Sequence, residues 1–263
     1  GYPLPAGWHD LPVIVHYYMP IGNYEMKKIR YVMALMTLFV ISAWACAGTA
    51  ADIPPSADLS YSVKAEYNGL ALNGDSSIQW KASAKNYSIR NEAKVSLFGK
   101  ILEADSTGRV DAQGLVPEKY TEKRLRKTQT TTLFDYVNHT VTFRADKTAP
   151  LNETVQDRAS IVWQLAAVAK ADPDRIVPGT TLTFPVAGSS KIEPWIFKVI
   201  KKDELTTPLG TIKTVELSRN DRKKQKMRVW LSPDHNWYPV QILFDEEGGL
   251  KLLQTIRNIA PLQ

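Results

Sequence analysis

A period-two alternation of apolar and polar residues constrains the fold of this chain more than any other feature. The stretch "LSYSVKAEY" at residues 59–67 places apolar side chains at every second position, with Ser, Lys and Glu between them. Successive side chains of a β-strand point to opposite faces, so this pattern predicts a strand with one buried face. Similar stretches follow between turn signals such as Asn68-Gly69. The first half of the chain is therefore predicted to be a meander of antiparallel strands.

One segment, "DRASIVWQLAAVAKADP", breaks this alternation. Its apolar residues recur at helical spacing from Ile161 to Ala169, either Asp157 or Ser160 can cap its start, and a proline stops it. The pattern predicts an amphipathic helix over about residues 157–171, whose apolar stripe packs on the sheet.

Strand patterns resume after the helix and continue almost to the end of the chain. About a dozen strands, without βαβ alternation or a glycine-rich phosphate loop, exclude a doubly wound nucleotide-binding fold. A sheet of that size rarely stays flat. The predicted fold is mainly β: a large curled antiparallel sheet, either a spiral or an open half-barrel, with one covering α-helix.

The stretch "MKKIRYVMALMTLFVISAWACAGTAAD", which begins at Met26, has the composition of a secretion signal. A basic start, about 15 uncharged residues and a run of small residues follow one another. We expect residues 26–50 to be a signal peptide, cleaved after Ala47, Ala50 or Ala51, and the mature protein to be periplasmic without a transmembrane span. The apolar run is shorter than the roughly 20 residues that span a bilayer. An uncleaved membrane anchor and a lipid on Cys46 are the alternatives.

The remaining segments follow from this interpretation. Residues 1–25 are interpreted as a non-native upstream extension, and residues 51–263 as a single periplasmic β domain. The only cysteine, Cys46, lies in the signal, so the mature chain is predicted to have no disulfide. The net charge of the whole sequence is only +6, which does not indicate a nucleic-acid partner.

No catalytic, cofactor or metal motif stands out in the sequence. After the signal the only histidines are His139 and His235, and neither has a second ligand pair beside it. Paired carboxylates such as Asp203-Glu204 leave an envelope-polymer hydrolase as a remote alternative. We expect no enzyme activity, no cofactor and no metal.

Two basic clusters are candidates for contact with an anionic surface. On a strand, Arg124 and Arg126 would share one face, as would Lys224, Lys226 and Arg228. They could meet lipid phosphates, or they could protect exposed sheet edges from pairing with another chain; the second interpretation is favoured.

Large apolar residues on the expected inner face are candidates for ligand binding. The set consists of Trp163, Leu165, Trp195 and Trp230. A curled sheet covered by one helix could leave an apolar groove beside them, or their rings could fill a dry core. The sequence does not distinguish the two.

Four stretches occur in an order that resembles a known family. They are "DRASIVWQLA", "TVELSR", "VWLSPDHNWYPVQI" and "GGLKLLQT". The order is similar to that in the uncharacterised proteobacterial family called domain of unknown function 3108, over about residues 56–260. The resemblance implies an exported, mostly antiparallel β protein, similar to curved or spiral envelope proteins and loosely to half-barrel lipoprotein carriers. It implies no activity and no catalytic residues.

The sequence thus favours a non-enzymatic periplasmic protein that supports envelope integrity. Its concave sheet would bind an apolar or amphipathic ligand (a lipid, a lipoprotein acyl chain or a peptide) or an envelope partner protein. The alternatives are a scaffold without a small ligand and, less favoured, the hydrolase.

Overall fold

A computed structural model describes residues 51–219, 226–245 and 249–262. The predicted upstream extension and signal peptide lie outside the described residues. The strands are β1 (Ala57–Tyr67), β2 (Leu70–Ala82), β3 (Asn86–Val95), β4 (Gly99–Asp111), β5 (Gly114–Arg124), β6 (Thr130–Asp135), β7 (Thr140–Thr142), β8 (Thr148–Pro150), β9 (Thr181–Ala187), β10 (Ile192–Thr207), β11 (Gly210–Arg219), β12 (Lys226–Leu231), β13 (Pro239–Asp245) and β14 (Leu250–Pro261). The helices are α2 (Ser160–Ala171) and the short 3₁₀ turns η1 (Arg144–Asp146), η2 (Pro173–Arg175) and η3 (Pro233–His235).

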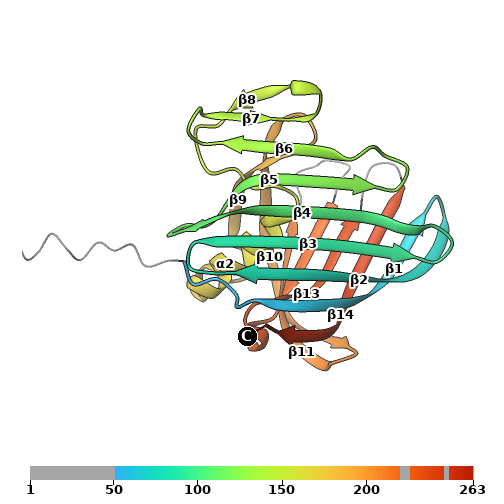
Figure 1. Cartoon of the computed structure of the whole chain (residues 1–263). Helices are drawn as coiled ribbons and strands as arrows, with labels where there is room; N and C mark the ends of the chain where they lie inside the picture. The colour runs from blue at the N-terminus through green and yellow to red at the C-terminus, as the bar shows by residue number, and fades with distance from the viewer. Residues whose placement is uncertain (1–50, 220–225, 246–248, 263) are drawn as a thin grey trace, which may run out of the picture. The chain divides into compact units, whose positions relative to one another are not determined.

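All fourteen strands form one antiparallel sheet in the order β8-β7-β6-β5-β4-β3-β2-β1-β14-β13-β12-β11-β10-β9. β1 pairs with β14, which joins the two halves of the sheet in its middle and leaves β8 and β9 as the two edges. The strands of the second half cross behind those of the first, with α2 in the space between them (Figure 1). The predicted curled antiparallel sheet is confirmed, with fourteen strands rather than about a dozen.

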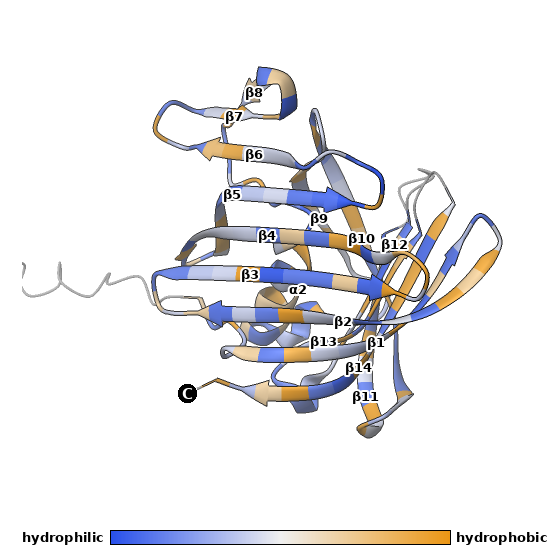
Figure 2. Cartoon of the chain, turned by 45° about the vertical axis from the view of Figure 1, so that its right-hand side comes forward, coloured by the Kyte–Doolittle hydropathy of each residue, from blue (hydrophilic) through white to orange (hydrophobic). Residues whose placement is uncertain are grey.

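The alternation in sequence is the reason for the two faces of the sheet. In β1, Leu59, Tyr61 and Val63 are at most 2% exposed, whereas the residues between them are partly exposed. Hydrophilic and hydrophobic residues alternate in the same way along many of the strands (Figure 2). Most buried apolar residues of both halves, together with those of α2, belong to one apolar cluster.

The helix differs from its prediction in two respects. It begins at Ser160, because Asp157 and the two residues after it form its cap: one oxygen of the Asp157 carboxylate accepts hydrogen bonds from the N–H groups of Ala159 and Ser160, both at 2.8 Å. It is also not a one-sided amphipathic helix, since nine of its twelve residues are buried. The sheet curls around α2, so the side of the helix that would otherwise face solvent is covered as well.

The apolar interior has a second part that α2 does not reach. A separate cluster contains Val63, Ala65, Leu72, Ala93, Val95, Ile101 and Leu252, and no residue of the helix. These residues lie on strands β1 to β4 and β14, near the turns that join β1 to β2 and β3 to β4. The helix therefore fills one part of the interior, and a different part borders the site described next.

Candidate functional site

A small pocket of about 40 Å³ lies beside the second apolar cluster. Its apolar walls come from β4 on one side and from β13 and β14 on the other. The lining residues are Asn91, Ile101, Leu102, Ala104, Tyr120, Glu122, Arg124, Arg158, Ala159, Phe244, Leu250 and Leu252. The pocket is thus apolar over most of its wall and ionic at one end.

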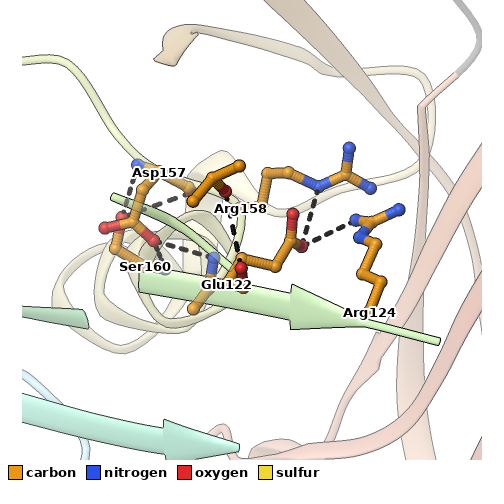
Figure 3. Close-up of polar contacts among 7 residues, drawn as sticks. Glu122, Arg124, Asp157, Arg158 and Ser160 are labelled. Atoms are coloured by element: carbon orange, nitrogen blue, oxygen red, sulfur yellow. Dashed lines mark hydrogen bonds and ion pairs between the residues drawn. The ribbon is translucent and has the colours of Figure 1, made fainter. Parts of the chain in front are cut away.

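Glu122 is the centre of that ionic end. It lies on β5 between the guanidinium groups of Arg124 and Arg158 (Figure 3). Its Oε1 atom is 2.7 Å from Nη2 of Arg124 and 3.7 Å from Nε of Arg158. All three side chains are only 14% exposed. Partly buried charges of this kind require their partners, because removing one would leave another charge without compensation.

The pKa of Glu122 depends on two opposing effects, its burial and the positive charges beside it. Burial alone would raise it, but the positive charges of Arg158 and Arg124, with hydrogen bonds from Arg124 and Tyr120, outweigh burial and hold the pKa of Glu122 below its usual range. Glu122 is therefore an ionised carboxylate at neutral pH, so the cluster presents two cations and one anion to the pocket.

Arg158 is positioned by the cap of α2. The neighbouring Asp157 is fully buried, and its carboxylate accepts a hydrogen bond of 2.5 Å from the Ser106 hydroxyl on β4 in addition to the two backbone N–H groups. Burial raises the pKa of Asp157 to about 6, against the lowering effect of these hydrogen bonds. This network fixes the segment before α2 on the sheet, which places Arg158 over β5.

A second, wider pocket of about 820 Å³ shares Glu122, Arg124 and Arg158 with the first. Its other lining residues are Arg126, Lys127, Thr128, Thr130, Arg144, Ala145, Lys147, Ser189 and Ser190. Six of the twelve lining residues are Arg or Lys, and one is acidic. We call this wider space the cationic pocket and the first one the apolar pocket.

An unpartnered polar atom also lies at the apolar pocket. Asn91, which is 9% exposed, lines this pocket, and its Oδ1 atom is buried without a hydrogen-bond partner among the described residues. Buried polar atoms without partners are rare in native proteins. A hydroxyl group of a bound molecule is one donor that would satisfy this atom.

The four apolar residues that sequence reasoning selected do not surround a common cavity, and none of them lines either pocket. Trp163 and Leu165 are fully buried on α2 and belong to the packed core. Trp195 lies at the boundary between this core and the ionic cluster, with the guanidinium of Arg219 at 3.9 Å and that of Arg158 at 5.9 Å from its ring centre. For these residues the structure shows the packed-core alternative.

Trp230 packs against the core cluster but is not enclosed in it. It is half-buried and alternates along β12 with Val229 and Leu231, which are fully buried in the core. Strand alternation therefore directs its ring to the opposite face.

The two basic clusters occupy different environments. Arg124 and Arg126 both line the cationic pocket, although β5 ends at Arg124 and Arg126 follows in the turn with a left-handed φ of 56°. Lys226 and Arg228 are exposed on the outer face of β12, where Arg228 is 3.5 Å from Glu216. Lys224 lies outside the described residues.

The interpretation that these cations protect sheet edges is wrong. β5 lies between β4 and β6, and β12 lies between β11 and β13, whereas the edges are β8 and β9. The cations on β5 and β12 are therefore not at positions where another chain could add a strand.

Sequence reasoning missed Glu122, Arg144, Lys147 and Arg158. One signal was available: Tyr120, Glu122 and Arg124 continue the inward positions of β5 in period two, which points these charges to the interior. Nothing in the sequence indicated that the segment before α2 would meet them there.

The described part of the chain contains neither a metal-binding cluster nor a membrane-spanning helix. Within it, no group of three or more His, Cys, Asp or Glu side chains is placed to hold a metal ion. None of its helices combines the length and apolarity that a membrane span requires.

Comparison with known proteins places this architecture among proteins of unknown function. No curated protein matches the chain. A solved structure, that of a β-barrel-like protein of the domain of unknown function DUF1849 from Brucella abortus, is similar with a TM-score of 0.51 and 11% identity, over 80% of this chain and 99% of that one. This likeness concerns the fold alone. The family model "Protein of unknown function (DUF3108)" matches residues 60–255, which confirms the resemblance seen in the sequence, and the chain belongs to the DUF3108 family.

Proposed function

We propose that this protein is a non-enzymatic, exported binding protein of the bacterial envelope, and that it binds an amphiphile with an apolar tail and an anionic head. The observation that carries the proposal is the apolar pocket, whose aliphatic and aromatic walls end at Arg124 and Arg158. The predicted signal peptide that begins at Met26 supports the proposal of export to the periplasm.

The walls of the pocket suit a short length of alkyl chain. Ile101, Leu102, Phe244 and Leu252 supply apolar surface from strands that lie apart in the sequence. Each methylene that leaves water for such surroundings contributes about 0.8 kcal/mol. A ligand of this kind needs few polar contacts along its tail, which agrees with the lining.

The ionic end suits a negatively charged head. Arg124 and Arg158 place two guanidinium groups beside Glu122 at this end of the pocket. An anionic group near them would accept charge-assisted hydrogen bonds. This arrangement favours an anionic amphiphile over a neutral hydrocarbon.

Filling the apolar pocket tests the proposal. Ala104→Phe adds a ring to the pocket wall, whereas Thr107→Phe adds the same ring at an exposed position of the same strand. We expect the first variant to bind the fluorescent fatty acid cis-parinaric acid at least about tenfold more weakly than wild type, and the second to bind it unchanged; tenfold corresponds to about 1.4 kcal/mol. Equal affinities in two variants with native circular dichroism would refute binding at this pocket.

Material that co-purifies with the protein provides a second readout. Organic extraction followed by mass spectrometry is expected to release lipid from the wild type and less from Ala104→Phe.

The scaffold alternative has one observation in its favour. The interior around Trp163 and Leu165 is filled by side chains, as in a protein with a purely structural role. Crosslinking in intact cells distinguishes the two functions, because specific protein partners together with a lipid-free extract would favour the scaffold.

A further inference from the structure

The cationic pocket carries more positive charge than a single carboxylate head would require. Glu122 already interacts with Arg124 and Arg158, yet four more cations line the space beyond them: Arg126, Lys127, Arg144 and Lys147. Lys127, Arg144 and Lys147 form no ion pair with any other described residue. Six cations against one carboxylate leave a net charge of +5 on the lining.

These cations come from separate parts of the fold. Arg126 and Lys127 lie in the turn after β5, and Arg158 precedes α2. Arg144 is the first residue of η1, the 3₁₀ turn between β7 and β8, and Lys147 follows that turn. Charges of one sign that repel one another are brought together here by the backbone. Their repulsion is relieved when a ligand of opposite charge binds between them.

Hydroxyl groups complete the lining. Thr128 lies between β5 and β6, Thr130 is the first residue of β6, and Ser189 and Ser190 lie in the turn between β9 and β10. Hydroxyls donate hydrogen bonds to anionic oxygens without adding charge. Several donors around one space suit a group with several acceptor oxygens, because each oxygen then finds a partner.

We propose that the cationic pocket binds the phosphate of a phosphomonoester lipid whose acyl tail leads into the apolar pocket. This inference rests on the proposed function and names the class of its ligand. A phosphomonoester carries a charge of about −1.5 to −2 at neutral pH and three strong acceptor oxygens. It therefore uses both the charge and the donors of the cationic pocket, whereas a carboxylate can be neutralised by Arg124 and Arg158 alone. The two pockets share these arginines, so one molecule can occupy both.

Ligands with the same tail and different heads test this inference. Isothermal titration of the protein with lauroyl lysophosphatidic acid, lauroyl lysophosphatidylcholine and lauric acid isolates the contribution of the head. Glycerol 3-phosphate supplies the head without a tail. We expect lysophosphatidic acid to bind at least about tenfold more tightly than the other three.

A charge-matched pair of variants locates the effect. Arg144→Gln with Lys147→Gln removes two positive charges from the cationic pocket, and Arg175→Gln with Lys213→Gln removes two from exposed positions outside both pockets. The first pair of substitutions is expected to weaken the binding of lysophosphatidic acid about tenfold without changing the affinity for laurate. The second pair is expected to change neither affinity.

The outcomes are distinguishable. Equal binding of all three lauroyl ligands would overturn the phosphate site and leave the proposed amphiphile binding intact. Binding of none of them would overturn the proposed function itself. Glycerol 3-phosphate binding as tightly as lysophosphatidic acid would show a site for a free phosphate ester and overturn the lipid assignment.

Discussion

The indole ring of Trp163 on α2 stacks on the indole ring of Trp80 on β2, with ring centroids 4.2 Å apart and planes inclined by 11°. Tyr238 approaches the ring of Trp163 edge-on, with the two ring centroids 6.2 Å apart. The Trp80 ring is in turn held by a hydrogen bond of 2.9 Å from its Nε1 atom to the carbonyl oxygen of Pro54. These contacts make the helix part of the core rather than a movable cover.

The stack predicts a large stability effect. Trp163→Ala should lower the free energy of unfolding by about 3–5 kcal/mol, because it removes a fully buried ring and leaves a cavity. Trp230→Ala, which truncates a half-buried ring on the other face, should cost clearly less. Urea unfolding followed by far-UV circular dichroism measures both values, and similar losses in the two variants would contradict the assignment of Trp163 to the core.

The raised pKa of Asp157 predicts how the free energy of unfolding depends on pH. Its pKa is raised by burial to about 6 in the folded protein, from 3.8 for an ordinary aspartate. The folded state therefore holds a proton that the unfolded state releases, so the contribution of Asp157 to stability is complete below pH 3.8 and is lost as the pH rises through 6. Relative to Asp157→Asn, the wild type should lose about 1 kcal/mol between pH 5 and pH 7.5.

The comparison with Asp157→Asn isolates this one group. The asparagine keeps an acceptor for the N–H groups of Ala159 and Ser160 and has no charge to titrate. Other titrating groups are common to both proteins and cancel in the difference. The measurement is chemical unfolding at several pH values, and a difference that is flat from pH 5 to 7.5, or that has the opposite slope, would contradict the raised pKa.

Much of the fold could be predicted because it is encoded locally. The alternation in β1 marks Leu59, Tyr61 and Val63 as buried, and the structure buries all three. Asp157 was a predicted cap of the helix, and its carboxylate does accept the hydrogen bonds of the first turn. Side-chain periodicity and capping depend on residues a few positions apart, so the sequence reveals them without knowledge of the tertiary structure.

The site depends instead on how the sheet curls. Glu122 and Arg158 lie far apart in the sequence and meet only because the segment before α2 crosses over β5. Trp230 alternates with the fully buried Val229 and Leu231, and a strand with large residues on both sides does not reveal which side is inner. Charged side chains on a strand are usually solvated. The Arg124 side chain is largely buried because the sheet curls over it.

Two glycines provide a test of strand packing. A Cβ atom on Gly108 of β4 would lie 2.1 Å from the carbonyl oxygen of Val116 on β5, so Gly108→Ala must displace one strand from the other. At Gly188 the nearest atom would be 3.4 Å away. Gly108→Ala is expected to destabilise the protein by about 2 kcal/mol or more, as forced shifts of packed backbone do, and Gly188→Ala by clearly less. Thermal unfolding compares the two, and equal melting temperatures would contradict the close approach.

Glu122 leads to the last prediction, that a carboxylate already present in the pocket competes with the anionic head of the ligand. Its Oε1 atom occupies the position near Arg124 and Arg158 that such a head would use, and its pKa below the usual range keeps it charged there. Glu122→Gln retains the shape and one acceptor but removes the negative charge, so an incoming anion no longer has to approach a carboxylate. We expect this variant to bind cis-parinaric acid several-fold to about tenfold more tightly, a gain of about 1 kcal/mol. Glu118→Gln, an exposed position of the same strand whose carboxylate pairs with Arg109, is the matched control and should bind as the wild type does. Weaker binding by Glu122→Gln would show that Glu122 holds the arginines in place for the ligand rather than competing with it.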